Sequence, residues 1–516
     1  MPNQGPSAAD MDAAFGLGSP VFNQTMERLS HIFSQAGHVP PVAARLRERQ
    51  RFWAGTHGQE TPDESLFIHQ TYLALLARLV ARRFIVPRRP IATAEELQEI
   101  ISGDYFSRQG LGNYGEGDFF SWVVLEDRWE LGLESRVLET VRGLVDAMAP
   151  YDFTQASPGI LDGLYRQTVP DSHSMPRWLA EYIVEEELGL ADDNPLGGNP
   201  GQSLLDPACG TGAFLAAAVR AISRTMMERG SDQLDVFFEV PTMVRGMDSD
   251  PLAVAMARLN YLLALGSLVQ EQHPPILVPV YLADASQIPA SHPTGSEDGA
   301  VSLSTPAGDF PLPAPIIENP MMLDWILGRL TNYMGGAQLR LHMQSEEEAV
   351  QEVMNAYYNY LTAPKARTPV PDPLTPADAD ILLETARSLV KLHIQGEGTL
   401  WLHAVQNYAA PAIFSRRRFD LLAGRGTVAL LESCSGLYLA PQGRAAMVMT
   451  SNEAATASAG RRLVRLEAVL PDTCLIVTGI VTGAEQRANL ELTGGPIPDN
   501  SSWADAKPSL RVTEGP

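Results

Sequence analysis

The chain has 516 residues, of which 45% are hydrophobic and 19% are charged, and its formal net charge is -23. This length exceeds the size at which a single hydrophobic core stops growing, so we expect two or three structural units of ordinary globular composition. The negative charge excludes a chain that binds nucleic acid through its overall electrostatic field, although a local basic face is compatible with it.

Cysteine usage and hydropathy suggest where the protein works. Cys209, Cys434 and Cys474 lie far apart without metal-ligand spacing, which predicts a reducing compartment, no disulfides and no bound metal. Residues 1–14 are polar and lack Lys and Arg, so we expect no secretory signal. No apolar run is expected to approach the roughly 20 residues that cross a bilayer, so we predict a cytoplasmic protein without membrane contact.

The region before about residue 150 predicts helices. Helical spacing of apolar residues is found at Ile68, Tyr72, Leu76 and Leu79. The pattern continues over 94–101, and two aromatic-rich turns, 101–106 and 118–122, interrupt it. Taken alone, these turns predict buried anchors of a core. A further helix is expected to begin at Pro176. Its buried side would carry Leu179, Ile183 and Val184.

The stretch 204–215 predicts a short apolar strand, a sharp glycine turn and a helix. The apolar face of that helix would consist of Phe214, Ala218, Ile222 and Met226. Gly210 and Gly212 remove side chains where a ligand must approach the backbone, and the helix start offers free N–H groups. A strand, turn and helix of this kind also occurs in other α/β proteins, so the glycines alone do not identify a ligand.

The stretch 244–251 predicts a second strand that ends in a carboxylate, Asp248. Asp250 is placed to cap the next helix, with Pro251 at its first position. A strand-end carboxylate beside a glycine turn can accept hydrogen bonds from both ribose hydroxyls. The dinucleotide fingerprint needs its acid about 20 residues after the glycines, and Asp248 lies much further on, which argues against NAD. The alternative interpretation is a pair of capping aspartates.

The rest of the chain predicts a third strand, an interruption and a return to the sheet. The third strand, 278–285, contains Asp284 near its end, and 289–315, rich in Pro, Gly, Ser and Thr, predicts a loop or linker. Apolar patterns predict helices over 323–360 and 376–392, and strands over 419–424, 445–450 and 475–481. The basic run 416–418 indicates either a solvated end of an element or a contact to DNA phosphates.

Residues 206–215, Asp-Pro-Ala-Cys-Gly-Thr-Gly-Ala-Phe-Leu, resemble the first S-adenosylmethionine motif of the adenine-N6 DNA methyltransferases. The resemblance implies an α/β, Rossmann-like, S-adenosylmethionine-dependent methyltransferase domain with a helical N-terminal domain and a helical insertion. It implies S-adenosyl-L-methionine as cofactor, with Asp248 on the ribose and Asp284 on the adenine amino group. The implied cofactor-binding residues are Asp206, Pro207, Ala208, Gly210, Gly212, Phe214, Asp248 and Asp284.

The resemblance also suggests a domain organisation. We expect a helical N-terminal domain (1–155), a cofactor-binding half (156–290), a linker with a helical insertion (291–410) and the second half (411–516). The aromatic strings in the first of these are similar to those of large restriction–modification and phage-defence methyltransferases. The family also carries a Tyr-Thr-Pro segment that packs over the cofactor, but here Ser174 and Met175 precede Pro176.

The family's catalytic motif, Asn-Pro-Pro-aromatic, has no clear counterpart. The acceptor oxygens and the aromatic ring of this motif suit the adenine N6 nitrogen, which becomes cationic during methyl transfer. At the equivalent position, 425–428, this chain has Arg-Gly-Thr-Val. A guanidinium offers only donors, and loss of one preorganised contact typically costs about 10²–10³ in rate, so we expect impaired catalysis. The short stretch that follows suggests a deleted catalytic loop. A rival location is Asn319 with Pro320, which a helix N-cap also explains.

By resemblance, the function would be site-specific adenine-N6 methylation of double-stranded DNA in a restriction–modification or phage-defence system. Little sequence follows residue 495, so we expect target recognition to require a partner subunit or the N-terminal helices. Two alternatives remain open at this point. One is a non-catalytic, cofactor-binding pseudo-methyltransferase subunit, and the other is a methyltransferase for a protein glutamine or an RNA amine.

Overall fold

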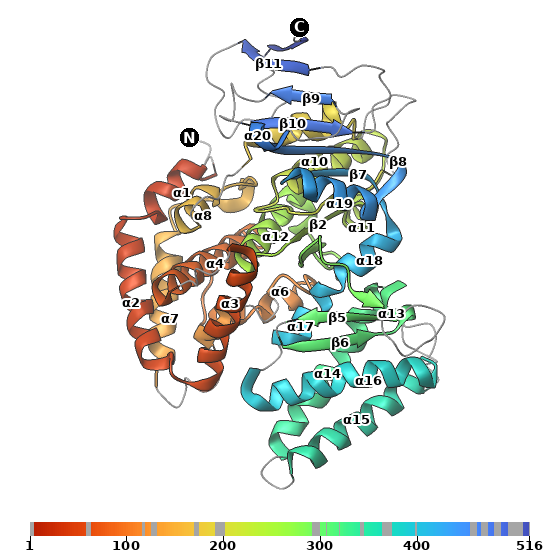
Figure 1. The fold of residues 1–516 in the computed structure, drawn as a ribbon. Coiled ribbons are helices and arrows are strands. Elements are labelled where there is room, and N and C mark those ends of the chain that lie inside the picture. The colour runs from red at the N-terminus through yellow and green to blue at the C-terminus, as the bar shows by residue number, and fades with distance from the viewer. Residues whose placement is uncertain are drawn as a thin grey trace.

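The protein is analysed as a computed structural model in which the placement of most of the chain is described. The described residues are 5–57, 63–115, 119–124, 132–169, 175–190, 202–291, 300–305, 307–318, 320–340, 345–363, 374–397, 400–454, 462–465, 473–478, 487–493 and 509–514. Within these residues, helices surround one nine-stranded sheet, and a small three-stranded sheet stands apart from it (Figure 1).

The central sheet is doubly wound. Its five parallel strands are β1 (Leu204–Asp206), β2 (Val244–Asp248), β3 (Val280–Leu282), β7 (Phe419–Arg425) and β8 (Leu439–Thr450). β1 pairs with β2 on one side and with β7 on the other, so the order of strands reverses at β1. In open α/β sheets, ligands bind outside the carboxyl ends of the strands at such a reversal. The predicted α/β, Rossmann-like fold class is confirmed.

Four more strands extend the sheet beyond β8 at the top of Figure 1. They are β10 (Thr473–Thr478), β9 (Arg462–Arg465), β11 (Arg487–Thr493) and β12 (Ser509–Glu514), in spatial order. β10 runs antiparallel to both β8 and β9, so the run of five parallel strands ends at β8, although β9 and β11 pair in parallel beyond it. The strands predicted over 445–450 and 475–481 correspond to β8 and β10.

The N-terminal region is helical, as predicted. Its elements are α1 (Ala8–Phe15), α2 (Pro20–Ala36), α3 (Pro40–His57), α4 (Glu64–Ile85), α5 (Ala94–Ser102), α6 (Asp104–Arg108), η1 (Phe119–Val124), α7 (Glu134–Ala147), η3 (Phe153–Gln155) and α8 (Asp162–Thr168). The aromatic-rich turns are core anchors: Phe106 is fully buried, and the Trp122 indole donates to Thr71 Oγ1 over 2.8 Å. Burial in the core is therefore enough to explain these aromatic residues, which resemble the aromatic-rich segments of the family.

A buried ion pair joins these helices to the sheet domain. Arg49 Nη2 of α3 lies 2.8 Å from Asp250 Oδ2, and the Arg49 side chain is completely buried. Asp250 Oδ1 accepts hydrogen bonds from the N–H groups of Leu252 and Ala253 and so caps α12 (Pro251–Leu265), as predicted. One hydrophobic cluster includes buried residues of both regions, and the predicted domain boundaries stay predictions.

α12 is more apolar than the sequence reasoning allowed. The segment Pro251–Val269, which adds the turn η5 (Gly266–Val269), has a mean hydropathy of 1.7 and the length of a membrane span. The expectation that no run approaches that length is therefore wrong. Its most apolar window is 83% buried inside the fold, where α12 packs between α4 and α10 (Ala213–Glu228). A core helix accounts for this composition.

The prediction of a loop over 289–315 is also wrong. β5 (Val301–Thr305) and β6 (Gly308–Leu312) form an antiparallel hairpin, and β4 (Ala290–Ser291) pairs with β5. Val301 lies opposite Leu312, and Leu303 lies opposite Phe310, so one face of the hairpin is buried. Small and turn-forming residues mask this alternation in the sequence.

The predicted helical insertion is present and covers the hairpin. Its elements are α13 (Ala314–Glu318), α14 (Pro320–Arg340), α15 (Glu346–Thr362), α16 (Pro376–Leu392), η6 (His393–Glu397), α17 (Leu400–Tyr408) and α18 (Ala410–Arg417). Thr385 of α16 donates to the Pro311 carbonyl, and the ring of Trp401 stacks on Phe310 at 6.4 Å. These contacts supply the buried face that the hairpin needs.

We predict that Arg49→Met lowers the free energy of unfolding by about 3–5 kcal/mol, because it leaves the Asp250 carboxylate buried without its cation. Chemical denaturation followed by fluorescence measures the change. The control is Arg108→Met, since the Arg108 side chain is 63% exposed in its ion pair with Glu99 and such pairs contribute about 0–1 kcal/mol. Equal losses in the two variants would contradict a structural role for the buried pair.

Candidate functional site

The glycine turn lies at the point where the strand order reverses. β1 ends at Asp206, and α10 begins at Ala213 directly after the turn. Gly210 and Gly212 have left-handed backbone angles, with φ of +52° and +84°. A Cβ atom at Gly210 would meet nothing within 4 Å, whereas one at Gly212 would lie 3.0 Å from Ala257 Cβ. Gly210 thus leaves open space beside the turn, and Gly212 instead lets α12 approach closely.

Asp248, the last residue of β2, holds the turn in place. Its Oδ2 accepts a hydrogen bond from Gly210 N at 2.8 Å, and its Oδ1 accepts one from Asp250 N at 2.8 Å. Burial raises the pKa of Asp248 to about 6, although these two backbone donors act in the opposite direction. Each carboxylate oxygen can accept more than one hydrogen bond, so the group keeps capacity for a ligand's hydroxyls.

Asp206 carries a buried oxygen without a partner. The residue is fully buried, and its Oδ1 accepts a hydrogen bond from Ala208 N at 3.2 Å. Its Oδ2 has no hydrogen-bond partner among the described residues, and burial raises the pKa of this carboxyl well above its usual range. A Cβ atom on Gly424 of β7 would lie 3.0 Å from Oδ1. A buried acceptor left unpaired is costly, so this position suits a donor from a ligand.

Asp284 follows β3 at the same edge of the sheet. Its Oδ1 accepts hydrogen bonds from Ser286 N at 2.9 Å and Ser286 Oγ at 2.7 Å. The preceding residue, Ala283, donates its N–H to the Asp248 carbonyl at 2.9 Å, and Tyr438 donates its hydroxyl to the Ala285 carbonyl at 2.6 Å. The carboxyl ends of β1, β2 and β3 therefore bring Asp206, Asp248 and Asp284 to one edge.

The remaining predicted cofactor residues divide into two groups. Pro207 and Ala208 belong to the turn after β1, beside Gly210. Phe214 is only 3% exposed and packs in the core as part of the predicted apolar face of α10.

The connection after β7 is short and occupied by a helix cap. Arg425 ends the strand, Thr427 Oγ1 accepts a hydrogen bond from Leu430 N at 3.1 Å, and α19 (Val428–Tyr438) begins at once. Arg425 Nη1 is buried and has no hydrogen-bond partner in the described part of the chain. Of the rival pair, Pro320 begins α14, and Asn319 lies outside the described residues.

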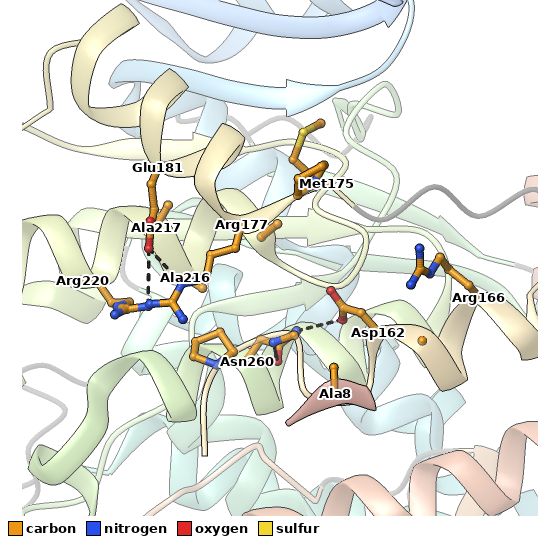
Figure 2. A pocket seen from close by; sticks show the side chains of 15 residues that line it. Ala8, Asp162, Arg166, Met175, Arg177, Glu181, Ala216, Ala217, Arg220 and Asn260 are labelled. Carbon is orange, nitrogen blue, oxygen red and sulfur yellow. Dashed lines mark hydrogen bonds and ion pairs between the residues drawn. The ribbon is translucent and has the colours of Figure 1, made fainter. Parts of the chain in front are cut away.

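A cavity of about 200 Å³ lies beside the start of α10, and the sequence reasoning did not predict it (Figure 2). Its walls come from α8, α9 (Arg177–Tyr182), α10 and α12. Charged lining residues are Asp162, Arg166, Arg177, Glu181 and Arg220. The signal in the sequence is the spacing of Arg177 and Glu181, four residues apart on one predicted helix, which places both side chains on the same face.

No protein-family model matches the chain, and no curated protein matches it either. Solved structures of restriction–modification enzymes are similar in fold at low identity. The type ISP enzyme LlaGI has 9% identity over 94% of this chain and 36% of its own, with a TM-score of 0.35. The DrdV–DNA complex has 8% identity over 99% and 46%, with a TM-score of 0.44.

A third similar structure is the methyltransferase subunit of a type I restriction–modification system from Streptococcus thermophilus. It has 13% identity over 95% of this chain and 90% of its own, with a TM-score of 0.32. This chain spans well under two thirds of the LlaGI and DrdV chains. At these identities and TM-scores, the likenesses carry no argument about activity.

We predict that Asp248→Asn changes how stability depends on pH. The folded-state pKa of about 6 lies above the ordinary value of about 3.9, so the folded protein binds this proton more tightly than the unfolded chain. The stabilising contribution of the protonated carboxyl is complete below about pH 4 and disappears as the pH rises through 6. The asparagine is neutral throughout, so the unfolding free energy of the variant minus that of the wild type should increase from pH 4 to pH 7.

Chemical denaturation at several pH values measures this difference. The control is Asp380→Asn, which changes an exposed carboxylate of α16 and should give a difference that does not rise in the same window. A flat profile for Asp248→Asn would contradict the role of burial at this carboxylate.

Proposed function

We propose that the protein binds S-adenosyl-L-methionine at the carboxyl edge of β1, β2 and β3 and serves as a methyltransferase-like subunit of a DNA restriction–modification or phage-defence system. The single observation that carries this proposal is the turn itself. Gly210 leaves open space, its N–H donates to Asp248, and the buried Oδ2 of Asp206 has no donor within the described part of the chain.

The residues at this edge fit the chemistry of the cofactor. Asp248 can accept the two ribose hydroxyls, and Asp284 can accept the adenine amino group. The carboxylates of Asp248 and Asp284 at this edge also favour a ligand that carries a positive sulfonium. When bound, that sulfonium supplies a reactive methyl group, and the residues of this chain bind and orient it.

We further propose that the chain does not methylate adenine N6 with its own residues. Arg425 stands where the family has the accepting asparagine, and its guanidinium has only donors. It would also oppose the positive charge that grows on the attacking nitrogen. The proposed role is therefore that of a pseudo-methyltransferase subunit in the cytoplasm, with double-stranded DNA and a target-recognition subunit as partners. An active enzyme that uses Asn319 is the rival.

We predict that isothermal titration of the protein with S-adenosyl-L-methionine gives saturable heat, which Gly210→Asp abolishes because an aspartate fills the open space and adds a repelling charge to the turn. Asp248→Ala should also remove binding. The control is Gly18→Asp, which shares a left-handed backbone (φ +82°) and open surroundings but lies far along the chain in the N-terminal helices. Absence of heat with the wild-type protein would refute the proposed cofactor.

We predict that transfer of a tritiated methyl group to adenine-containing DNA equals that of a boiled sample, while an active adenine-N6 methyltransferase labels the same DNA. The reason is the missing acceptor at Arg425. Incorporation that Asn319→Ala removes would establish the rival and overturn the pseudo-methyltransferase proposal.

A further inference from the structure

The cavity beside α10 has a wall with excess positive charge. Arg177 Nε lies 3.0 Å from Glu181 Oε1, and Arg220 Nη1 lies 3.4 Å from the same oxygen (Figure 2). Two guanidinium groups thus share a single carboxylate oxygen. Arg220 Nη1 is buried and has no hydrogen-bond partner among the described residues. Two cations therefore face one carboxylate, and this wall retains a net positive charge for an anionic group.

The opposite wall carries a carboxylate. Asp162 Oδ1 accepts a hydrogen bond from Asn260 Nδ2 at 3.4 Å, and the same Nδ2 donates to the Thr211 carbonyl at 2.8 Å. Burial raises the pKa of Asp162 to about 6, and the hydrogen bond from Asn260 acts in the opposite direction by favouring the anionic form. Figure 2 shows Asp162 across the cavity from Glu181 and the two arginines. Arg166 also lines the cavity, and its charge acts on both Asp162 and the neighbouring Asp12, so this side has one cation for two carboxylates. Net charges of opposite sign on the two sides match a zwitterion, such as the amino-acid group of a ligand.

The cavity adjoins the carboxylate edge through two connections. Ala213, the first residue of α10, lines the cavity and follows Gly210 by three residues, so their Cα atoms lie at most about 11 Å apart. On α8, Tyr165 lies one turn beyond Asp162, and the charges of Asp250, Asp248 and Asp162 all help to raise the pKa of its hydroxyl, after burial. A direct contact supports the same placement, because Asn260, which lines the cavity, donates its Nδ2–H to the Thr211 carbonyl within the glycine turn.

The start of α10 adds donors to this region. Gly212 occupies the N-cap position and offers no side-chain hydrogen bond, so the N–H groups of the first turn lack a capping partner. Such groups, together with the positive end of the helix dipole, favour a carboxylate nearby. These N–H groups therefore add to the attraction of Arg177 and Arg220 for an anionic group.

On the basis of the proposed function, we propose that this cavity holds the amino-acid end of S-adenosyl-L-methionine. Arg177 and Arg220 bind its α-carboxylate, and Asp162 binds its α-ammonium group. Glu181 orients the two guanidinium groups. In this proposal they take over the role of the family's Tyr-Thr, which is absent here because Ser174 and Met175 precede Pro176. The residues proposed to bind the tail thus come from α8, α9 and α10.

Three ligands distinguish the contributions of the α-carboxylate and the α-ammonium group to binding. S-adenosyl-L-methionine has both charged groups, its decarboxylated form keeps the ammonium only, and 5′-methylthioadenosine lacks the whole amino-acid end. Isothermal titration with Arg220→Gln and Arg177→Gln should weaken S-adenosyl-L-methionine by about tenfold to a hundredfold, as expected for loss of a charged hydrogen bond. Binding of the decarboxylated form and of 5′-methylthioadenosine should change by less than about twofold.

Asp162→Asn should show the complementary pattern. It should weaken both ligands that carry the ammonium group and leave 5′-methylthioadenosine unaffected. The matched control is Arg224→Gln, one turn further along α10, where Arg224 pairs with Glu185 at 2.8 Å outside the cavity and is 47% exposed. Its affinity for all three ligands should equal that of the wild type, and thermal denaturation checks that each variant is folded.

The outcomes distinguish this inference from the proposed function. If the wild type binds S-adenosyl-L-methionine and the arginine variants bind it equally well, the tail lies elsewhere and the inference fails alone. It also fails if these variants weaken all three ligands to the same degree, since that marks a structural role. If neither S-adenosyl-L-methionine nor 5′-methylthioadenosine binds the wild type, the proposed cofactor itself fails.

Discussion

The carboxylate pair at the end of β2 is the constraint on which the rest of the site depends. Asp248 accepts the Gly210 N–H and the Asp250 N–H, so one side chain fixes both the glycine turn and the start of α12. Asp250 caps α12 and forms an ion pair with the buried Arg49 of the N-terminal helices. The turn, the strand edge and the helical region are therefore coupled through two residues, and displacement of either one affects all three.

The local distribution of charge explains how an acidic protein can have a defined binding region. The net charge of -23 is spread over the chain, while the strand edge gathers three carboxylates and the adjoining cavity gathers arginines on one wall. A ligand with a positive centre and a zwitterionic tail meets complementary charge in each part. Buried charges have little water to screen them, so local arrangement outweighs the overall field.

The connection after β7 differs from the edge formed by β1, β2 and β3. The strand and its neighbours keep the geometry of a doubly wound sheet, and under the proposed function Arg425 and the cap at Thr427 stand where a catalytic turn would be needed. Cofactor binding and catalysis would depend on different residues, so the proposed function separates the two. Arg425 Nη1 is buried in this region and has no hydrogen-bond partner among the residues that the structure describes.

The sequence by itself determined the elements around the glycine turn, because apolar periodicity, caps and strand-end acids are local signals. The strands ending at Asp206 and Asp248 and the Asp250–Pro251 helix start were predicted from them. Tertiary structure alone decided which distant residues meet, such as Arg49 and Asp250, 201 positions apart. It also revealed the hairpin of β5 and β6 and the charged cavity, because its walls come from separate helices and no local pattern records their packing.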